Sequence, residues 1–97
     1  MTLQFHSRAR LDIIQAVTWY ENQRKDLGKR FNKDLVAVLK KISKSPFQFP
    51  IVFEEFRKAR LGKTFPFSII YIVVDGTVYI IAIVHDKREP DFWKERI

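Results

Sequence analysis

The chain has 97 residues, a formal net charge of +7 and no cysteine. This length predicts one domain over residues 1–97, and a composition of 46% hydrophobic and 30% charged residues is typical of a globular protein. The absence of cysteine excludes disulfides, thiolate metal sites and cysteine nucleophiles, and fits a reducing cytosol. We expect a cytoplasmic protein, because neither a signal peptide nor an apolar run of the roughly 20 residues that span a bilayer is visible.

Positive charge is concentrated in two places. Residues 1–45 carry ten Lys/Arg against four Asp/Glu, and a second basic block contains Arg57, Lys58, Arg60 and Lys63. A basic balance favours nucleic acid, the ribosome or an acidic protein as partner. A solvated cationic surface without a specific partner explains the same charge.

The first half of the chain predicts a short strand and two helices. Residues 3–5 alternate as in a strand, and Ser7 is a suitable N-cap for a helix over residues 7–25. After a break at Leu27-Gly28, apolar residues again recur at helical spacing until Pro46, with lysines on the other side. The short link predicts an antiparallel helix pair.

The second half predicts strands. Strand signals run from about residue 52 to 61, and Asp75-Gly76 between two apolar runs is typical of a type I′ hairpin. A two-residue turn fixes the register of that hairpin. The predicted pairs are Val74–Thr77, Tyr71–Ile80, Phe67–Val84 and Pro66–His85.

This register divides the hairpin into two faces. One face is wholly apolar and should meet the helix pair, which can cover only one side of a small sheet. The other face carries four isoleucines among polar residues, more than a solvated face normally shows. We expect either a partner protein or the C-terminal tail, with a helical turn over residues 90–96 and Trp93 as a packing anchor, to cover it. The isoleucines are Ile70, Ile72, Ile81 and Ile83.

Six segments stand out in chain order: WYE at Trp19–Glu21, LGKRF at Leu27–Phe31, SPFQFP at Ser45–Pro50, FRKARL at Phe56–Leu61, FPFSIIY at Phe65–Tyr71 and HDKREPDFW at His85–Trp93. Taken together, these segments resemble the RelE/ParE superfamily of bacterial toxins. The resemblance implies an α+β fold of order β-α-α-β-β-β, in which a helix hairpin packs on one face of a small twisted antiparallel sheet. It also implies the toxin half of a type II toxin–antitoxin or plasmid stabilisation module, whose antitoxin would bind the four isoleucines.

The superfamily divides by mechanism, and the resemblance leaves two targets open. RelE-like members cut messenger RNA on the ribosome, whereas ParE-like members inhibit DNA gyrase without chemistry, and some relatives have no established target. The tail pattern H-x-x-R-x-P-x-x-W resembles the ParE-like branch, while the +7 charge and the histidine favour RNA. An inactive binding module is a third reading, and self-association of the free chain is a further expectation.

If the protein cleaves RNA, His85 is the candidate base or acid and Arg88 a candidate phosphate-binding cation. The resemblance implies Arg57, rather than Arg60, as the second such cation, because it matches the arginine that opens the strand after the loop. Alternatively, His85 only ends its strand and Arg88 only pairs with a neighbouring acid, namely Asp86, Glu89 or Asp91. We predict neither a metal site nor a cofactor, because no cysteine, histidine cluster or glycine-rich loop is present. The candidate residues for binding nucleic acid or the target are Lys58, Arg60, Lys63 and Tyr79.

Overall fold

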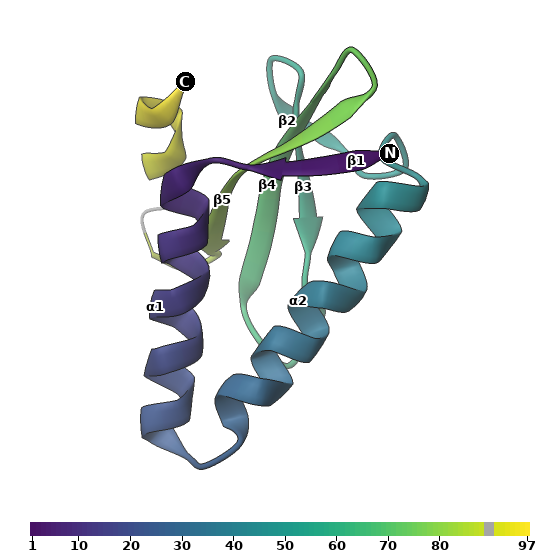
Figure 1. Ribbon diagram of the computed structural model, residues 1–97. Coiled ribbons are helices and arrows are strands. Elements are labelled where there is room, and N and C mark those ends of the chain that lie inside the picture. The colour runs from purple at the N-terminus through teal and green to yellow at the C-terminus, as the bar shows by residue number, and fades with distance from the viewer. Residues whose placement is uncertain (89–90) are drawn as a thin grey trace.

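The computed structural model describes residues 1–88 and 91–97, and shows two helices packed on one face of a five-stranded sheet (Figure 1). The sheet has the order β1-β5-β4-β3-β2. It is mixed rather than fully antiparallel, because the edge strand β1 runs parallel to β5. The elements are β1 (Thr2–Phe5), α1 (Ser7–Gln23), α2 (Leu27–Lys44), β2 (Ile51–Phe53), β3 (Phe56–Arg60), β4 (Phe67–Val74), β5 (Thr77–His85) and the 3₁₀ helix η1 (Phe92–Arg96).

The two predicted helices form, but their ends are set by residues other than those expected. His6, not Ser7, caps α1, and its Nδ1 accepts a hydrogen bond from the Arg8 backbone N–H at 3.0 Å. α2 begins at Leu27 rather than after Gly28. The Glu21 carboxylate explains this start, because it accepts from the N–H groups of Asp26 and Gly28, both at 3.0 Å.

The strand predicted near residues 52–61 is a tight hairpin of β2 and β3. Glu54, in the turn between them, has the left-handed φ of 50°. The predicted Asp75-Gly76 turn is confirmed, because both residues have positive φ (50° and 75°), as a type I′ turn requires. The described residues after the helices therefore form four strands, not three.

The predicted β4–β5 register is confirmed near the turn and wrong beyond it. Val74 faces Thr77 and Tyr71 faces Ile80, but a bulge then shifts the pairing by one residue. Phe67 consequently faces His85 rather than Val84. Past the bulge every β5 side chain changes face, so Ile83 turns toward the helices.

The main core lies between the helix pair and this face of the sheet. Its centre is aromatic: Phe31 of α2 packs edge-on against Phe65 (5.3 Å between ring centroids) and Phe67 (5.1 Å). Tyr71 is fully buried there, and its hydroxyl donates to the Pro46 carbonyl. The loop that follows α2 is therefore tied to the middle of β4.

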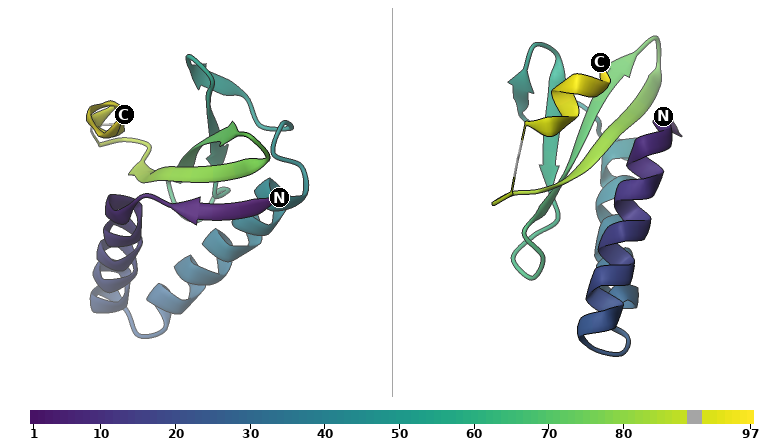
Figure 2. Two further views of the ribbon diagram at one scale, coloured as in Figure 1. Left: turned by 45° about the horizontal axis from the view of Figure 1, so that its top comes forward. Right: turned by 90° about the vertical axis from the view of Figure 1, so that its left-hand side faces the viewer.

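The C-terminal tail covers the middle of the second face of the sheet, as one of the two alternatives from the sequence predicted. Figure 2 shows η1 and the two helices on opposite sides of β5. Trp93 of η1 is 2% exposed, and its ring packs against the rings of Phe53 and Phe56, with 5.9 Å and 5.4 Å between ring centroids. The predicted helical turn is η1, and Trp93 is its anchor as expected. Pro90, where that turn was predicted to begin, and Glu89 lie outside the described residues.

The expectation that the four isoleucines form one open surface is therefore wrong. Ile70 and Ile81 are buried in a cluster with Trp93, and Ile83 is buried on the helix side. Only Ile72 is partly exposed, near the β4–β5 turn.

Candidate functional site

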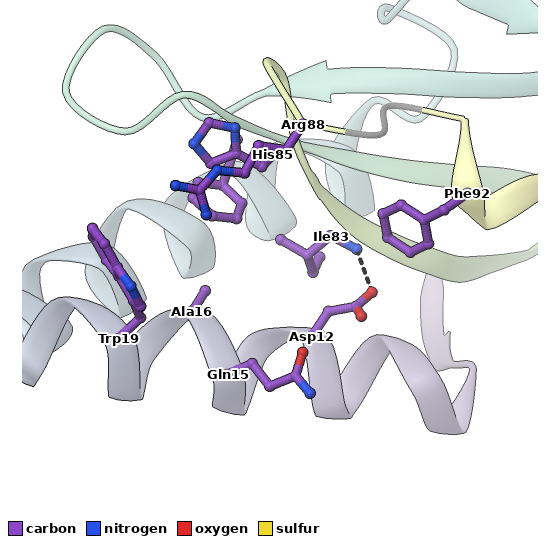
Figure 3. Close-up of a pocket in the computed structure, with 9 residues that line it drawn as sticks. Asp12, Gln15, Ala16, Trp19, Ile83, His85, Arg88 and Phe92 are labelled. Carbon is purple, nitrogen blue, oxygen red and sulfur yellow. Dashed lines mark hydrogen bonds between the residues drawn. The ribbon is translucent and has the colours of Figure 1, made fainter.

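A groove of about 590 Å³ lies between α1 and the end of β5 (Figure 3). Its floor is apolar, built by Ala16, Phe67 and Ile83, and its wall carries the half-exposed ring of Trp19. We call this the α1 groove. Among residues 1–88 and 91–97, those that line it are Asp12, Gln15, Ala16 and Trp19 from α1, Phe67 from β4, Ile83 and His85 from β5, Arg88, and Phe92 from η1.

Trp19 is the feature of the groove that most suggests a partner. Its neighbour Tyr20 points into the core and stacks on Phe31 (5.4 Å), whereas Trp19 remains 50% exposed and meets the Tyr20 ring edge-on at 5.1 Å. A large aromatic ring held in place beside an apolar floor is typical of a binding hot spot.

His85 ends β5 at the rim of the groove. Its ring packs edge-on against Phe67 (5.0 Å), and its Nδ1 accepts a hydrogen bond from the Lys87 backbone N–H at 3.1 Å. Burial, and then the positive charge of Arg88, lower the pKa of His85 below its ordinary value of 6.5. Both effects favour the neutral ring, and the hydrogen bond accepted by Nδ1 favours the tautomer that carries its proton on Nε2.

Arg88 lies beside His85 in the same groove (Figure 3). Within residues 1–88 and 91–97, the ion pairs expected between Arg88 and Asp86 or Asp91 do not form. Asp86 instead pairs with Lys58 and Arg60, and Asp91 pairs with Lys94 at 3.6 Å.

Arg57 does not join His85 and Arg88. It faces Tyr71 on β4, whereas His85 faces Phe67, so the two positions differ by four residues, or about 13 Å, along the strand direction. Its Nη1 donates to the carbonyls of Phe49 (2.7 Å) and Phe47 (3.2 Å). The structure thus brings together two of the three predicted catalytic residues, and gives Arg57 a contact that orders the loop after α2.

The predicted target-binding residues do not form one surface: three lie on the tail-side face of the sheet, namely Lys58, Arg60 and Tyr79, and Lys63 lies in the loop between β3 and β4. Lys58 and Arg60 lie around the Asp86 carboxylate, at 3.6 Å and 3.9 Å, and Lys63 lines a shallow pocket with Arg60. Tyr79 is 36% exposed and faces Ile72 near the β4–β5 turn. The cluster around Trp93 occupies the face between these two ends.

Asp12 and Arg96 were not singled out from the sequence, yet they set the geometry of the groove. Their side chains form a two-point ion pair of 2.7 Å and 2.9 Å and are 12% and 7% exposed. Asp12 also accepts from the Ile83 N–H (3.0 Å), and Arg96 donates to the Ile81 carbonyl (3.0 Å). The ion pair therefore binds the β5 backbone at Ile81 and Ile83, just after Ile80, the last β5 residue that pairs with β1. The available signal was an acid on the buried stripe Ala9–Asp12–Ala16 of α1.

The described part of the chain offers neither a cluster of metal ligands nor a membrane-spanning helix. Residues 1–88 and 91–97 contain no cluster of three or more His, Asp or Glu side chains arranged to hold a metal ion. No helix in the same residues is long and apolar enough to cross a membrane.

Comparison with known proteins gives a family match and a structural match. The sequence model of the family described as "ParE toxin of type II toxin-antitoxin system, parDE" matches residues 3–90. The fold is similar to a chain from the chromosomal ParDE toxin–antitoxin system of P. aeruginosa. That match has a TM-score of 0.76 and 19% sequence identity, and it covers 88% of this chain and 95% of the other. No individually curated protein sequence matches significantly.

Proposed function

Because this chain belongs to the ParE toxin family of type II toxin–antitoxin systems, we propose that it inhibits growth by binding DNA gyrase and not by cutting RNA. The chain is the toxin of such a system, and its partner is a cognate antitoxin. We place the antitoxin in the α1 groove and the action of the toxin in the cytoplasm, where gyrase works.

The single observation that carries the non-enzymatic reading is the state of His85. RNA cleavage by the 2′-hydroxyl needs a base, an acid and cations around one phosphate. The Nδ1 of His85 accepts a hydrogen bond from the Lys87 N–H, so His85 could take a proton from RNA at this nitrogen only if that bond broke. Arg57, the second predicted cation, is bound to loop carbonyls instead. This supports a binding surface more than a catalytic centre.

The chemistry of the α1 groove fits a segment of the antitoxin with apolar anchors and an acidic residue. Ala16, Phe67 and Ile83 offer an apolar floor, and Trp19 offers a ring against which an anchor can pack. Arg88 at the rim offers a cation for a carboxylate. Of the four isoleucines predicted to bind the antitoxin, Ile83 keeps that role in our proposal, because it lines this groove.

The gyrase contact in our proposal uses the exposed parts of the opposite face. Tyr79 and Ile72 form its apolar end, where the exposed side chain of Val74 adjoins them. Lys58, Arg60 and Lys63 form its basic end, partly neutralised by Asp86.

The antitoxin site is tested with two variants of one helix. Trp19→Glu places a charge in the groove. Leu11→Glu is the control, because Leu11 is another exposed apolar residue of α1 (55% exposed, against 50% for Trp19) that does not line the groove. We expect Trp19→Glu to weaken antitoxin binding at least about 30-fold, the loss of an interface hot spot, and Leu11→Glu to bind normally. Equal binding by both variants would place the antitoxin elsewhere.

The target is tested by expressing the chain without its antitoxin. Our proposal predicts loss of DNA supercoiling with intact messenger RNA, and the same outcome for His85→Gln, whose side chain cannot exchange a proton near pH 7. Cut messages that disappear in His85→Gln cells would favour the RelE-like alternative. Size-exclusion chromatography of the purified free chain then tests the predicted self-association.

A further inference from the structure

The outward face of α2 carries six exposed cations in two groups of three. Asp34 is the only acid within α2, and it is half-buried. At 3.6 residues per turn, all six cations fall within an arc of about 120° around the helix axis. We call this set the α2 stripe: Lys29, Arg30 and Lys33, followed by Lys40, Lys41 and Lys44.

We propose that the α2 stripe binds the phosphate backbone of duplex DNA without reading its sequence. Lys33 and Lys40 are seven residues apart, which is about 10.5 Å along the axis at 1.5 Å per residue. This separation is close to the roughly 12 Å width of the DNA major groove, so the two groups can each meet one strand. The small or neutral residues between them, Val36 and Ala37, leave the approach open.

Charge and composition favour a nucleic acid over an acidic protein. Lysine is depleted from the buried centres of protein interfaces but contacts phosphates readily as a point charge. The only large apolar side chain exposed on α2 is Val36, at 38%, which offers little for a protein hot spot.

A membrane surface is a poorer fit than DNA. A basic helix that binds lipid must insert its apolar side into the bilayer. The apolar side of α2 is already in the core, where Phe31, Leu35 and Ile42 are at most 1% exposed. The helix therefore offers only its charged side to a partner.

The stripe is separate from the α1 groove. The described residues of the groove belong to α1, β4, β5, η1 and the segment that follows β5. Figure 1 shows that α1 and α2 diverge from their connecting turn. Of these two helices, only α1 contributes described residues to the groove. An occupied groove thus leaves the stripe accessible, and this proposal stands independently of the gyrase target.

The test uses fluorescence anisotropy to measure binding of the purified chain to a labelled 30-base-pair DNA duplex of arbitrary sequence. Binding is measured between about 50 and 200 mM KCl, because the affinity that comes from phosphate contacts depends strongly on salt in this range. The stripe variant is Lys33→Gln/Lys40→Gln/Lys44→Gln. The control variant, Arg8→Gln/Arg10→Gln/Lys87→Gln, removes the same charge from exposed positions outside both α2 and the groove. Circular dichroism melting checks that both remain folded.

We expect the stripe variant to bind at least about tenfold more weakly at 0.1 M salt, with the slope of log K against log[salt] reduced by about 2.7, or 0.9 for each lost phosphate contact. The control should change this slope by less than about one. Equal weakening of both variants would show that only net charge matters and would overturn the proposal. Tighter binding to duplex RNA, single-stranded RNA or polyglutamate than to duplex DNA would overturn it as well.

Discussion

The ion pair between Asp12 and Arg96 makes the sharpest prediction about stability. The Asp12 carboxylate accepts three hydrogen bonds, two from Arg96 and one from the Ile83 N–H, and both charged side chains are nearly buried. Removing one partner of such a pair leaves the other charge buried and costs about 3–5 kcal/mol. A domain of this size has a total unfolding free energy of only about 5–15 kcal/mol, so either single change should be severe.

A double-mutant cycle of Asp12→Asn, Arg96→Met and the combined variant measures the pair directly. We expect each single change to cost about 3 kcal/mol. The double variant leaves no unpaired charge, so it should cost clearly less than the sum, with a coupling energy of about 2–3 kcal/mol. Urea unfolding in a Trp19→Phe background supplies these values, because Trp93 is then the only tryptophan and reports on the tail.

The fluorescence of Trp93 provides the second readout. If the ion pair holds η1 in place, the single variants should shift Trp93 emission to longer wavelength in native buffer, because its 2% exposed ring becomes solvated. Additive costs, with a coupling below about 0.5 kcal/mol, together with unchanged Trp93 emission would refute the assignment of this pair as the anchor of the tail.

Three further predictions concern the fold. Gly28→Ala should lower the urea midpoint of unfolding by the equivalent of about 1–3 kcal/mol. The methyl group of the new alanine would lie 2.7 Å from the Val17 carbonyl oxygen, where α1 and α2 meet. An unchanged midpoint would contradict this close contact. Burial raises the pKa of Tyr71 to about 12 from 10.0, so the protein loses stability as pH rises from 10 toward 12. Thermal melts at pH 7.5 and 10.5 should show that Tyr71→Phe loses less stability at the higher pH than the wild type does. The pKa of His85 is lowered below 6.5, so its contribution to stability is present above pH 6.5 and is lost as pH falls through the folded-state pKa. His85→Gln should therefore lose less stability than the wild type between pH 7.5 and 5.5. An identical loss of stability in both proteins would contradict the direction of the pKa shift.

The fold was predictable from the sequence wherever one local signal fixed the geometry. Asp75-Gly76 determines a type I′ turn, and the pairing from Val74–Thr77 to Tyr71–Ile80 follows from it. The bulge beyond Ile80 was not predictable, because residues 78–84 are apolar on both faces and alternation carries no information there. That one-residue shift moved Ile83 from the predicted open face to the helix side.

The candidate site was only half predictable for a different reason. His85 and Arg88 are three residues apart, so their proximity follows from the chain itself. Arg57 could be assigned only by family pattern, and its carbonyl partners at Phe47 and Phe49 belong to a loop whose path the sequence does not specify. Asp12 and Arg96 are 84 residues apart, and only tertiary structure joins them.

The proposal that this toxin acts by binding and not by chemistry is tested most directly with purified DNA gyrase. A supercoiling assay with the wild-type chain and with His85→Gln should show inhibition by both at similar concentrations. The account would be contradicted if neither chain affected gyrase while the wild-type chain, but not His85→Gln, cleaved messenger RNA in a purified translation reaction.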